Sequence, residues 1–320
     1  MARKQQLNLD QDQYRCRGAF TSLRQLLDQR HVARNLELNY SSRTRLGMTG
    51  THISRIKGRG VDFEEHRAYQ PGDDIRTIDW RVTARTGRPF TKVFREERER
   101  PVIIGVDQSH NMYFGSQVAF KSVVAAEAAA IICWTTVDNG DRVGGVVFSD
   151  NKQELVKPRR SKRSALRFLN ALADYNQDLV NSHIANTEQG GKLKAALEQM
   201  CRITKPGSNV YLISDFNDYD LACEKLIQQL AIHNSMTCVL IYDELESNLP
   251  KPGLYSITDG RARTALDTYS RNVRELYHQG FDDHIAQLQR NLSKCQVPLI
   301  TIKTNQLVME QLETWKQKTP

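Results

Sequence analysis

The chain of 320 residues carries 45 lysines and arginines against 37 aspartates and glutamates, so its formal net charge is +8. With 39% hydrophobic and 26% charged residues, the composition excludes a disordered chain and allows one large folded domain plus a smaller one. The positive charge favours acidic partners, such as nucleic acid, anionic lipid or an acidic protein face, although a cationic surface alone is the simpler interpretation.

Two features of the sequence predict a cytoplasmic protein with no membrane span. The six cysteines are scattered and form no C-x-x-C pair, and residues 1–17 are polar and charged, unlike a secretory signal. The longest apolar stretch, residues 118–137, contains Lys121 and Glu127. It therefore predicts a buried, alanine-rich helix and not a helix that crosses a bilayer.

Two regions precede the main alternation of strands and helices. Residues 1–45 are expected to form an N-terminal segment that is partly helical, because their apolar side chains recur at helical spacing. Residues 46–100 are dense in charged and aromatic residues and predict a small block that contains β-strands. Within this block Pro71-Gly72 marks a turn, and Asp73 or Asp74 is placed to cap a short helix after it.

Residues 101–320 predict one α/β domain with a C-terminal extension. Strands are expected at 102–107, 142–149, 153–157, 209–214, 236–242 and 297–303, a hairpin near 253–265, and helices at 116–138, 163–175, 191–202, 219–232, 268–293 and 306–316. Strands that alternate with helices imply right-handed crossovers and therefore a doubly wound, mainly parallel sheet.

Three of these strands end at an acidic residue, namely Asp107, Asp215 and Asp243. Side chains just past the carboxyl ends of parallel strands line the ligand crevice of open α/β sheets, so these residues are expected at one edge. The string Asp107-Gln108-Ser109-His110-Asn111 places carboxylate, hydroxyl and amide oxygens at alternate positions, which is suited to a hard cation such as Mg²⁺. The simpler alternative is a loop whose Asp and Ser accept hydrogen bonds from the backbone.

These motifs resemble two known families. The Asp107-to-Asn111 string, the alanine-rich stretch after it, Gly140-Asp141-Arg142-Val143-Gly144 and Leu212-Ile213-Ser214-Asp215-Phe216 resemble a von Willebrand factor A domain. The upstream block resembles the bacterial "domain of unknown function 58" family, which joins such a block to an A-type domain. Its motifs are Arg67-Ala68-Tyr69, Pro71-Gly72-Asp73-Asp74-Ile75-Arg76, Ile78-Asp79-Trp80 and Ala84-Arg85.

The resemblance implies a Rossmann-like A domain with a metal-ion-dependent adhesion site, where a partner's carboxylate completes the shell of the metal. Asp107, Ser109 and Asp215 match the expected Asp, first Ser and distal Asp. Asn111 stands where a second Ser is expected, and Lys192 stands where Thr or Ser usually follows the glycines. A protonated lysine has no lone pair for a metal, but its ammonium group could neutralise the two aspartates instead. Either Mg²⁺ or Lys192 is therefore expected in the site.

The resemblance also implies a partner, an AAA+ ATPase of the MoxR type, in a chaperone-like system. Other A-domain proteins are further possible partners. The sequence contains no G-x-x-x-x-G-K-[ST] motif, so no bound nucleotide is expected. The favoured function is accordingly a non-catalytic adaptor that binds a partner at a complete or degenerate adhesion site.

Two other functions remain open from the sequence. The acidic residues between 62 and 79, together with His66, could form a metal-dependent phosphodiester hydrolase. Interleaved arginines favour instead a structural network of ion pairs, formed by Arg67, Asp73, Asp74, Arg76, Asp79 and Arg85. The basic run 157–163 could bind nucleic-acid phosphates, although it contains no aromatic residues and a solvated loop is the simpler interpretation.

Overall fold

The computed structural model describes residues 12–34, 61–71, 74–96, 100–181, 190–258 and 263–318. The chain separates into two compact units, of which the larger combines Met1–Thr44 with Arg100–Pro320 and the smaller is Arg45–Glu99. The small unit is thus an insertion in the sequence of the large one, because the chain on both sides of it belongs to the large unit.

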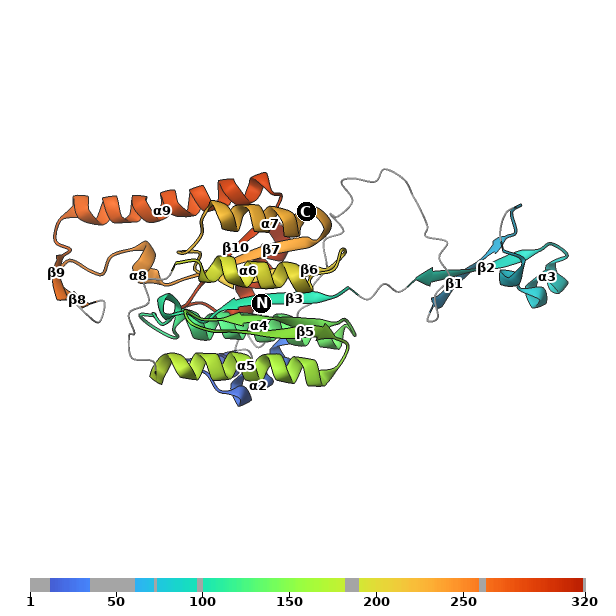
Figure 1. The fold of residues 1–320 in the computed structure, drawn as a ribbon, viewed down its shortest axis with the longest axis horizontal. Helices are drawn as coiled ribbons and strands as arrows, with labels where there is room; N and C mark the ends of the chain where they lie inside the picture. The colour runs from blue at the N-terminus through green and yellow to red at the C-terminus, as the bar shows by residue number, and fades with distance from the viewer. Residues whose placement is uncertain are drawn as a thin grey trace, which may run out of the picture. The chain divides into compact units, whose positions relative to one another are not determined.

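The large unit is built around a six-stranded sheet in the order β10-β7-β6-β3-β4-β5 (Figure 1). Its strands are β3 (Val102–Asp107), β4 (Val143–Phe148), β5 (Gln153–Arg159), β6 (Asn209–Ser214), β7 (Ser235–Tyr242) and β10 (Leu299–Lys303). Every neighbouring pair is parallel except β4 and β5, which are antiparallel. The predicted doubly wound, mainly parallel sheet is confirmed.

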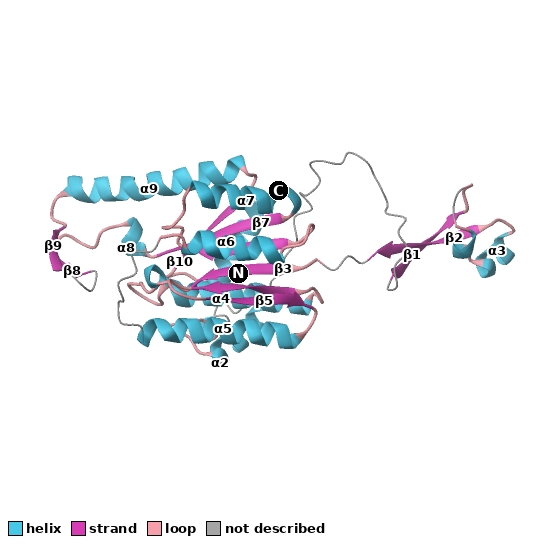
Figure 2. Ribbon diagram, in the orientation of Figure 1, coloured by secondary structure: helices cyan, strands magenta, loops and turns pink. Residues whose placement is uncertain are grey.

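Helices cover both faces of this sheet (Figure 2). One hydrophobic cluster lies between the sheet and four helices, α2 (Leu23–Ala33), α4 (Lys121–Asp138), α5 (Lys162–Asn181) and α10 (Val308–Lys318). The other lies beneath α6 (Lys192–Ile203), α7 (Leu221–His233) and α9 (Arg271–Lys294). Helices cover both faces of β3, β4, β6 and β7. The sequences of these strands are therefore continuous apolar runs and do not alternate between apolar and polar residues.

Helix α4 is the most deeply buried helix that the structure describes, with every residue from Lys121 to Thr136 buried. It has the sheet on one side and α2 on the other, and the indole Nε1 of Trp134 donates a hydrogen bond to the carbonyl of Leu26 at 3.0 Å. A helix enclosed in this way is apolar all round, as the alanine-rich sequence predicted. It begins at Lys121 and not at residue 116, because the preceding loop pairs with Gly18 through the backbone.

Several short elements complete the large unit. The turn η2 (His110–Met112) follows β3, and α8 (Glu244–Ser247) follows β7. The hairpin predicted near 253–265 is formed by β8 (Leu254–Thr258) and β9 (Arg263–Asp267). Within the part of the chain that the structure describes, a search for helices long and apolar enough to cross a bilayer finds none.

The small unit consists of an antiparallel pair, β1 (Val61–Ala68) and β2 (Phe90–Glu96), with η1 (Ile75–Thr77) and α3 (Trp80–Thr86) between them. Asp74 caps η1, since its carboxylate accepts a hydrogen bond from the backbone of Arg76 at 2.9 Å. Asp79 caps α3 by accepting from two backbone N–H groups of its first turn. These caps satisfy helix-end donors that would otherwise lack partners.

Candidate functional site

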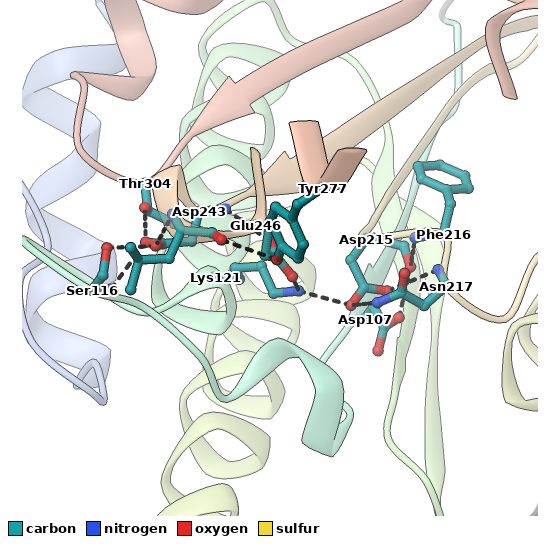
Figure 3. A network of polar contacts seen from close by, with 12 residues as sticks. Asp107, Ser116, Lys121, Asp215, Phe216, Asn217, Asp243, Glu246, Tyr277 and Thr304 are labelled. Carbon is teal, nitrogen blue, oxygen red and sulfur yellow. Dashed lines mark hydrogen bonds and ion pairs between the residues drawn. The ribbon is translucent and has the colours of Figure 1, made fainter. Parts of the chain in front are cut away.

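The acidic residues that follow β3, β6 and β7 lie at the same edge of the sheet (Figure 3). The three strands are parallel neighbours in the order β7-β6-β3, so their carboxyl ends meet there. Asp107 lies beside Asp215, whereas Asp243 belongs to a second group of polar contacts nearby. We call these contacts together the carboxyl-edge cluster; it comprises Asp107, Ser109, Ser116, Lys121, Asp150, Lys192, Ser214, Asp215, Asp243, Glu246 and Thr304.

Asp107 ends β3 with a side chain that is only 1% exposed. One carboxylate oxygen accepts a hydrogen bond from the backbone of Ser109 at 2.9 Å, and the other accepts from the hydroxyl of Ser214 at 2.7 Å. Burial, together with the nearby charge of Asp215, raises the pKa of Asp107 to about 6, although the two serines and Lys192 act in the opposite direction. The fold thus buries the carboxylate of Asp107, and burial makes its ionised form less stable than it would be in water.

Lys121 supplies one of the two cations of the cluster, and it is not among the site residues that the sequence predicts. Its side chain is 1% exposed, and its ammonium group donates to Asp215 at 3.0 Å and to Glu246 at 2.6 Å. Burial alone would lower the pKa of Lys121, but the two carboxylates outweigh it and the pKa is raised. The sequence carried one signal for this role: a single lysine at the start of an otherwise apolar stretch.

The turn after β6 fixes the direction of Asp215. Phe216 adopts a left-handed backbone conformation with φ of 55°, which is uncommon for a residue other than glycine and costs about 1 kcal/mol. Its ring is fully buried, and its N–H donates to the hydroxyl of Ser214 at 3.1 Å. Asn217 then donates to Asp215 through both its backbone and its side chain, so the carboxylate is held from several directions.

Lys192 begins α6 and is also nearly buried, with 10% of its side chain exposed. Its ammonium group donates to Asp150 at 3.0 Å, and burial, which would lower the pKa of Lys192, is outweighed by Asp107 and Asp150, so that the pKa is raised. The backbone N–H groups of Gly191 and Lys192 both donate to Asp218. Lys192 thus lies within electrostatic reach of Asp107, while its direct partner is Asp150.

The structure separates the remaining predicted ligands, Ser109 and Asn111. Ser109 is fully buried beside Asp107, and its hydroxyl has no hydrogen-bond partner. Asn111 lies in η2 and is exposed. The neighbouring His110 donates its backbone N–H to Asp150 at 2.7 Å, which ties the loop to Asp150. The loop therefore brings the first two predicted oxygens together and places the third at the surface.

Asp243 anchors the second half of the cluster. Its carboxylate accepts hydrogen bonds from the backbone and hydroxyl of Ser116 and from the hydroxyl of Thr304. Burial would raise the pKa of Asp243, but these hydrogen bonds outweigh it and the pKa is lowered. Its backbone N–H donates to Glu246 at 2.8 Å, and Glu246 also accepts from Lys121. Glu246 therefore joins both halves into one network (Figure 3).

The small unit uses its predicted acidic residues differently. The imidazole Nε2 of His66 lies 3.0 Å from a carboxylate oxygen of Asp79, while Asp74 and Asp79 cap helices as described above. Asp73 and the side chains of residues 61–65 lie outside the described residues. The arginines proposed for the ion-pair network lie in β1, η1 and α3, respectively Arg67, Arg76 and Arg85. Among the described residues, no group of three His, Cys, Asp or Glu side chains is placed to hold a metal.

The basic run 157–163 is distant from the carboxyl edge. It covers the end of β5 and the start of α5, and its lysine and arginine side chains are exposed. Because β5 is antiparallel to β4 and Arg159 pairs with Val143, the run lies at the amino ends of the parallel strands. The structure therefore keeps the cationic loop and the buried carboxylates at opposite edges of one sheet.

Comparison with known proteins finds one matching family and several related chains. The sequence profile of the family described as "Protein of unknown function DUF58" matches residues 65–287. Uncharacterized proteins of Mycobacterium bovis and Mycobacterium tuberculosis are 26% identical over 273 residues, which covers 85% of this chain and 84% of each relative.

Two solved structures share features of the fold at low sequence identity. The conserved hypothetical protein BatB from Bacteroides thetaiotaomicron is 13% identical with a TM-score of 0.39, covering 68% of this chain and 98% of that chain. The SpRpn10 VWA domain is 12% identical with a TM-score of 0.36, covering 68% of this chain and 95% of that chain.

Proposed function

The chain belongs to the DUF58 family, and we propose that it is a non-catalytic interaction module that binds a partner protein at the carboxyl edge of its von Willebrand factor A-like sheet. One observation supports this most strongly: Asp107 and Asp215 are held almost buried at that edge with Lys121 and Lys192 as built-in cations. Buried ion pairs contribute little net stability. Their concentration at the edge where such folds bind ligands favours a recognition role.

The chemistry of the cluster supports binding more than catalysis. A general base must reach its substrate and have a pKa near the working pH. Asp107 has a pKa of about 6, but both its oxygens accept hydrogen bonds and its side chain is almost inaccessible. Lys121 has a raised pKa and remains an ammonium group that cannot accept a proton.

The donor set does not complete a divalent-metal shell. Asp107, Ser109 and Asp215 offer oxygens, but Asn111 is exposed and Lys192 stands in place of a further hydroxyl. Two ammonium groups already neutralise part of the negative charge, and a divalent ion beside them would be repelled. We therefore favour a degenerate adhesion site in which lysines replace the metal.

The metal-bound form is the second candidate, and one observation favours it. The hydroxyl of Ser109 is buried without a hydrogen-bond partner, which is unusual for a polar atom in a folded protein. In this form Asp107, Ser109 and Asp215 would hold Mg²⁺, and the ion would supply a positive centre for a partner's carboxylate.

Metal titration separates the two forms. Isothermal calorimetry with MgCl₂ and MnCl₂ is expected to show no binding to the wild-type protein and measurable binding to Lys192→Thr, which removes a cation and restores a hydroxyl. Wild-type binding that disappears in Asp107→Ala would instead establish the metal form. Glu198→Gln, an exposed change on α6, is the control for altered charge alone.

The partner that we propose is a MoxR-type AAA+ ATPase, on the basis of the family resemblance. Biolayer interferometry with the MoxR-type ATPase of the same genome is expected to show binding that persists in EDTA. Asp215→Asn should weaken binding, while Glu198→Gln should leave it unchanged. Equal binding by wild-type protein and Asp215→Asn would remove the carboxyl edge from the interaction, and no binding by the wild type would remove this partner.

A further inference from the structure

Helix α9 is only partly packed against the sheet. Its carboxyl-terminal half contributes Leu288 and Leu292 to the core, whereas all residues from Arg271 to Gly280 except Arg274 are exposed. Figure 1 shows this amino-terminal half running beyond the strands on the side where α8 lies. About half of the helix therefore gains little from tertiary packing, which is normally the main source of helix stability.

The exposed half presents an apolar row at helical spacing, which we call the α9 stripe: Val273, Leu276, Tyr277 and Gly280. Leu276 is 67% exposed, and Val273 and Tyr277 are exposed as well. At 3.6 residues per turn the row spans about 100° of the helix surface, and its Tyr277 side lies about 20° from the direction of the buried Leu288. It therefore continues the packed face onto the exposed half of the helix, and exposed apolar faces on helices mark interaction surfaces.

Gly280 is an unexpected residue at the end of this row, near the middle of α9. Glycine in a helix interior costs about 1 kcal/mol relative to alanine. Apart from its chain neighbours and the adjacent backbone of α9, no atom of the described chain lies within 4 Å of the position a Cβ would take, so tertiary packing does not require glycine here. A glycine on an exposed apolar face would allow the backbone of another helix to approach closely.

The α9 stripe adjoins the carboxyl-edge cluster. The hydroxyl of Tyr277 donates to the backbone carbonyl of Leu245 at 3.1 Å, and the imidazole Nδ1 of His278 lies 3.0 Å from the carbonyl of Ser247. Both contacts fix α9 to α8, the element that carries Glu246. Figure 3 shows Tyr277 beside Glu246. A partner bound on the stripe would therefore reach the cluster at the carboxylate of Glu246.

The carboxyl-edge cluster offers negative charge to a partner bound on the stripe. The five carboxylates of the cluster, those of Asp107, Asp150, Asp215, Asp243 and Glu246, stand against its two ammonium groups, those of Lys121 and Lys192. The ammonium groups are nearly buried, whereas the side chains of Glu246 and Asp150 are 27% and 20% exposed. Although the whole chain has a net charge of +8, its carboxyl edge thus complements a cationic group.

We propose that the α9 stripe and Glu246 together dock an amphipathic helix of a partner protein, with its apolar residues on the stripe and a lysine or arginine against Glu246. This inference rests on the proposed function and specifies the partner's chemistry: a helix with an apolar face beside a basic residue. An amphipathic helix carries its apolar residues at i, i+3, i+4 and i+7, which is the spacing of the stripe, so two such helices can pack with their apolar faces together. The basic residue distinguishes this partner from one that would bring a carboxylate to a metal.

Site-specific photo-crosslinking in cells that produce the full chain tests the inference. A photoreactive amino acid is placed at Leu276, and at Ile232 on α7 as an exposed apolar control. Crosslinking at position 276 is expected to join a segment of another protein whose sequence combines apolar residues at helical spacing with a lysine or arginine within one turn. Glu246→Gln should lower the yield about tenfold, since a contact to a charged group is lost.

A second pair of variants separates docking from folding. Gly280→Leu should lower the crosslink yield about as much as Glu246→Gln, while Gly280→Ala should keep most of it, and both should unfold at least at the wild-type temperature. Crosslinks to a second copy of this chain, to an acidic segment, or at equal yield from positions 276 and 232 would overturn the inference, as would the absence of any crosslink. If the ATPase binds through Asp215 without these crosslinks, the proposed function stands and the docking surface is wrong.

Discussion

Lys121 and Glu127 are charged side chains that α4 buries, and they are compensated in different ways. Lys121 is paired with Asp215 and Glu246, whereas Glu127 accepts one hydrogen bond from the backbone of Cys16 at 3.0 Å. The sequence showed both residues inside an apolar stretch, which was enough to argue against a membrane span. It could not show their partners, because Glu246 is 125 positions from Lys121 and Cys16 is 111 positions from Glu127.

Removing the Lys121 cation is expected to destabilise the protein strongly. Lys121→Met leaves two carboxylates without their counter-charge and should lower the free energy of unfolding by about 3 kcal/mol. Lys194→Met, which removes an exposed lysine four residues from Glu198, should cost less than about 1 kcal/mol. Urea denaturation of both variants measures the difference. Equal losses would show that the buried network contributes no more than a surface pair.

Glu127 is expected to make stability depend on pH. Burial raises its pKa to about 7 from a usual value of 4.5, although the N–H of Cys16 and the charge of Arg15 oppose this and Asp12 adds to it. Because the folded pKa lies above the unfolded one, the stabilisation by the protonated form is complete below about 4.5 and is lost as pH rises through 7.

Glu127→Gln removes this dependence by keeping a neutral side chain of the same size. The variant should therefore gain stability relative to the wild type as pH rises, by an amount that approaches about 3 kcal/mol above pH 8. Urea denaturation at a series of pH values measures the gain. Parallel stability curves for the two proteins would contradict it, and Glu198→Gln controls for loss of a surface charge.

At the scale of elements, the strands could be predicted from the sequence, whereas the exposed amino-terminal half of α9 could not. Apolar runs of strand length that end at an acidic residue identify β3, β6 and β7, because burial on both faces leaves a continuous apolar sequence. The same reasoning located Asp107 and Asp215 at one edge. The apolar spacing of α9 continues along its whole length, so nothing in its pattern distinguishes the packed half from the exposed half.

Two glycines are expected to respond oppositely to alanine substitution. At Gly280 an added methyl group meets no atom within 4 Å, so Gly280→Ala should stabilise the protein by about 0.5–1 kcal/mol. At Gly145 in β4 the methyl group would lie 2.0 Å from the carbonyl oxygen of Ile104, so Gly145→Ala should cost at least about 2 kcal/mol. Chemical denaturation of the pair checks both signs, and a loss at Gly280 would contradict the exposed position of that face.

For the whole molecule, the N-terminal segment is an integral part of the large unit. Leu26, Val32 and Ala33 of α2 belong to the main hydrophobic cluster, and Arg15 donates to the backbone beyond β10. The described core residues of both clusters lie outside Arg45–Glu99. The order of segments along the sequence could not reveal that α2 belongs to the large unit. The small unit separates α2 from the rest of the large unit in the sequence, so the N-terminal segment looks like a region of its own.

Two deletions are expected to differ in their effects for this reason. Replacing residues 45–99 by a glycine–serine linker should leave a cooperative unfolding transition, because the large unit keeps both hydrophobic clusters. Removing residues 1–34 should lower stability by several kcal/mol, since apolar side chains of α2 are lost from the core. Circular dichroism during thermal unfolding checks both variants. If the linker variant were unfolded and the truncated variant folded, the core would depend on residues 45–99 and not on α2.

The insertion of the small unit within the large one also governs how proteolysis would act on the protein. One cut between α2 and β1 leaves the small unit covalently joined to β3, and one cut between β2 and β3 leaves it joined to α2. A singly nicked molecule consists of two polypeptides that remain associated through the packing of α2 on α4. Release of the small unit therefore requires two cleavages, and a denaturing gel would detect the nick while gel filtration would not.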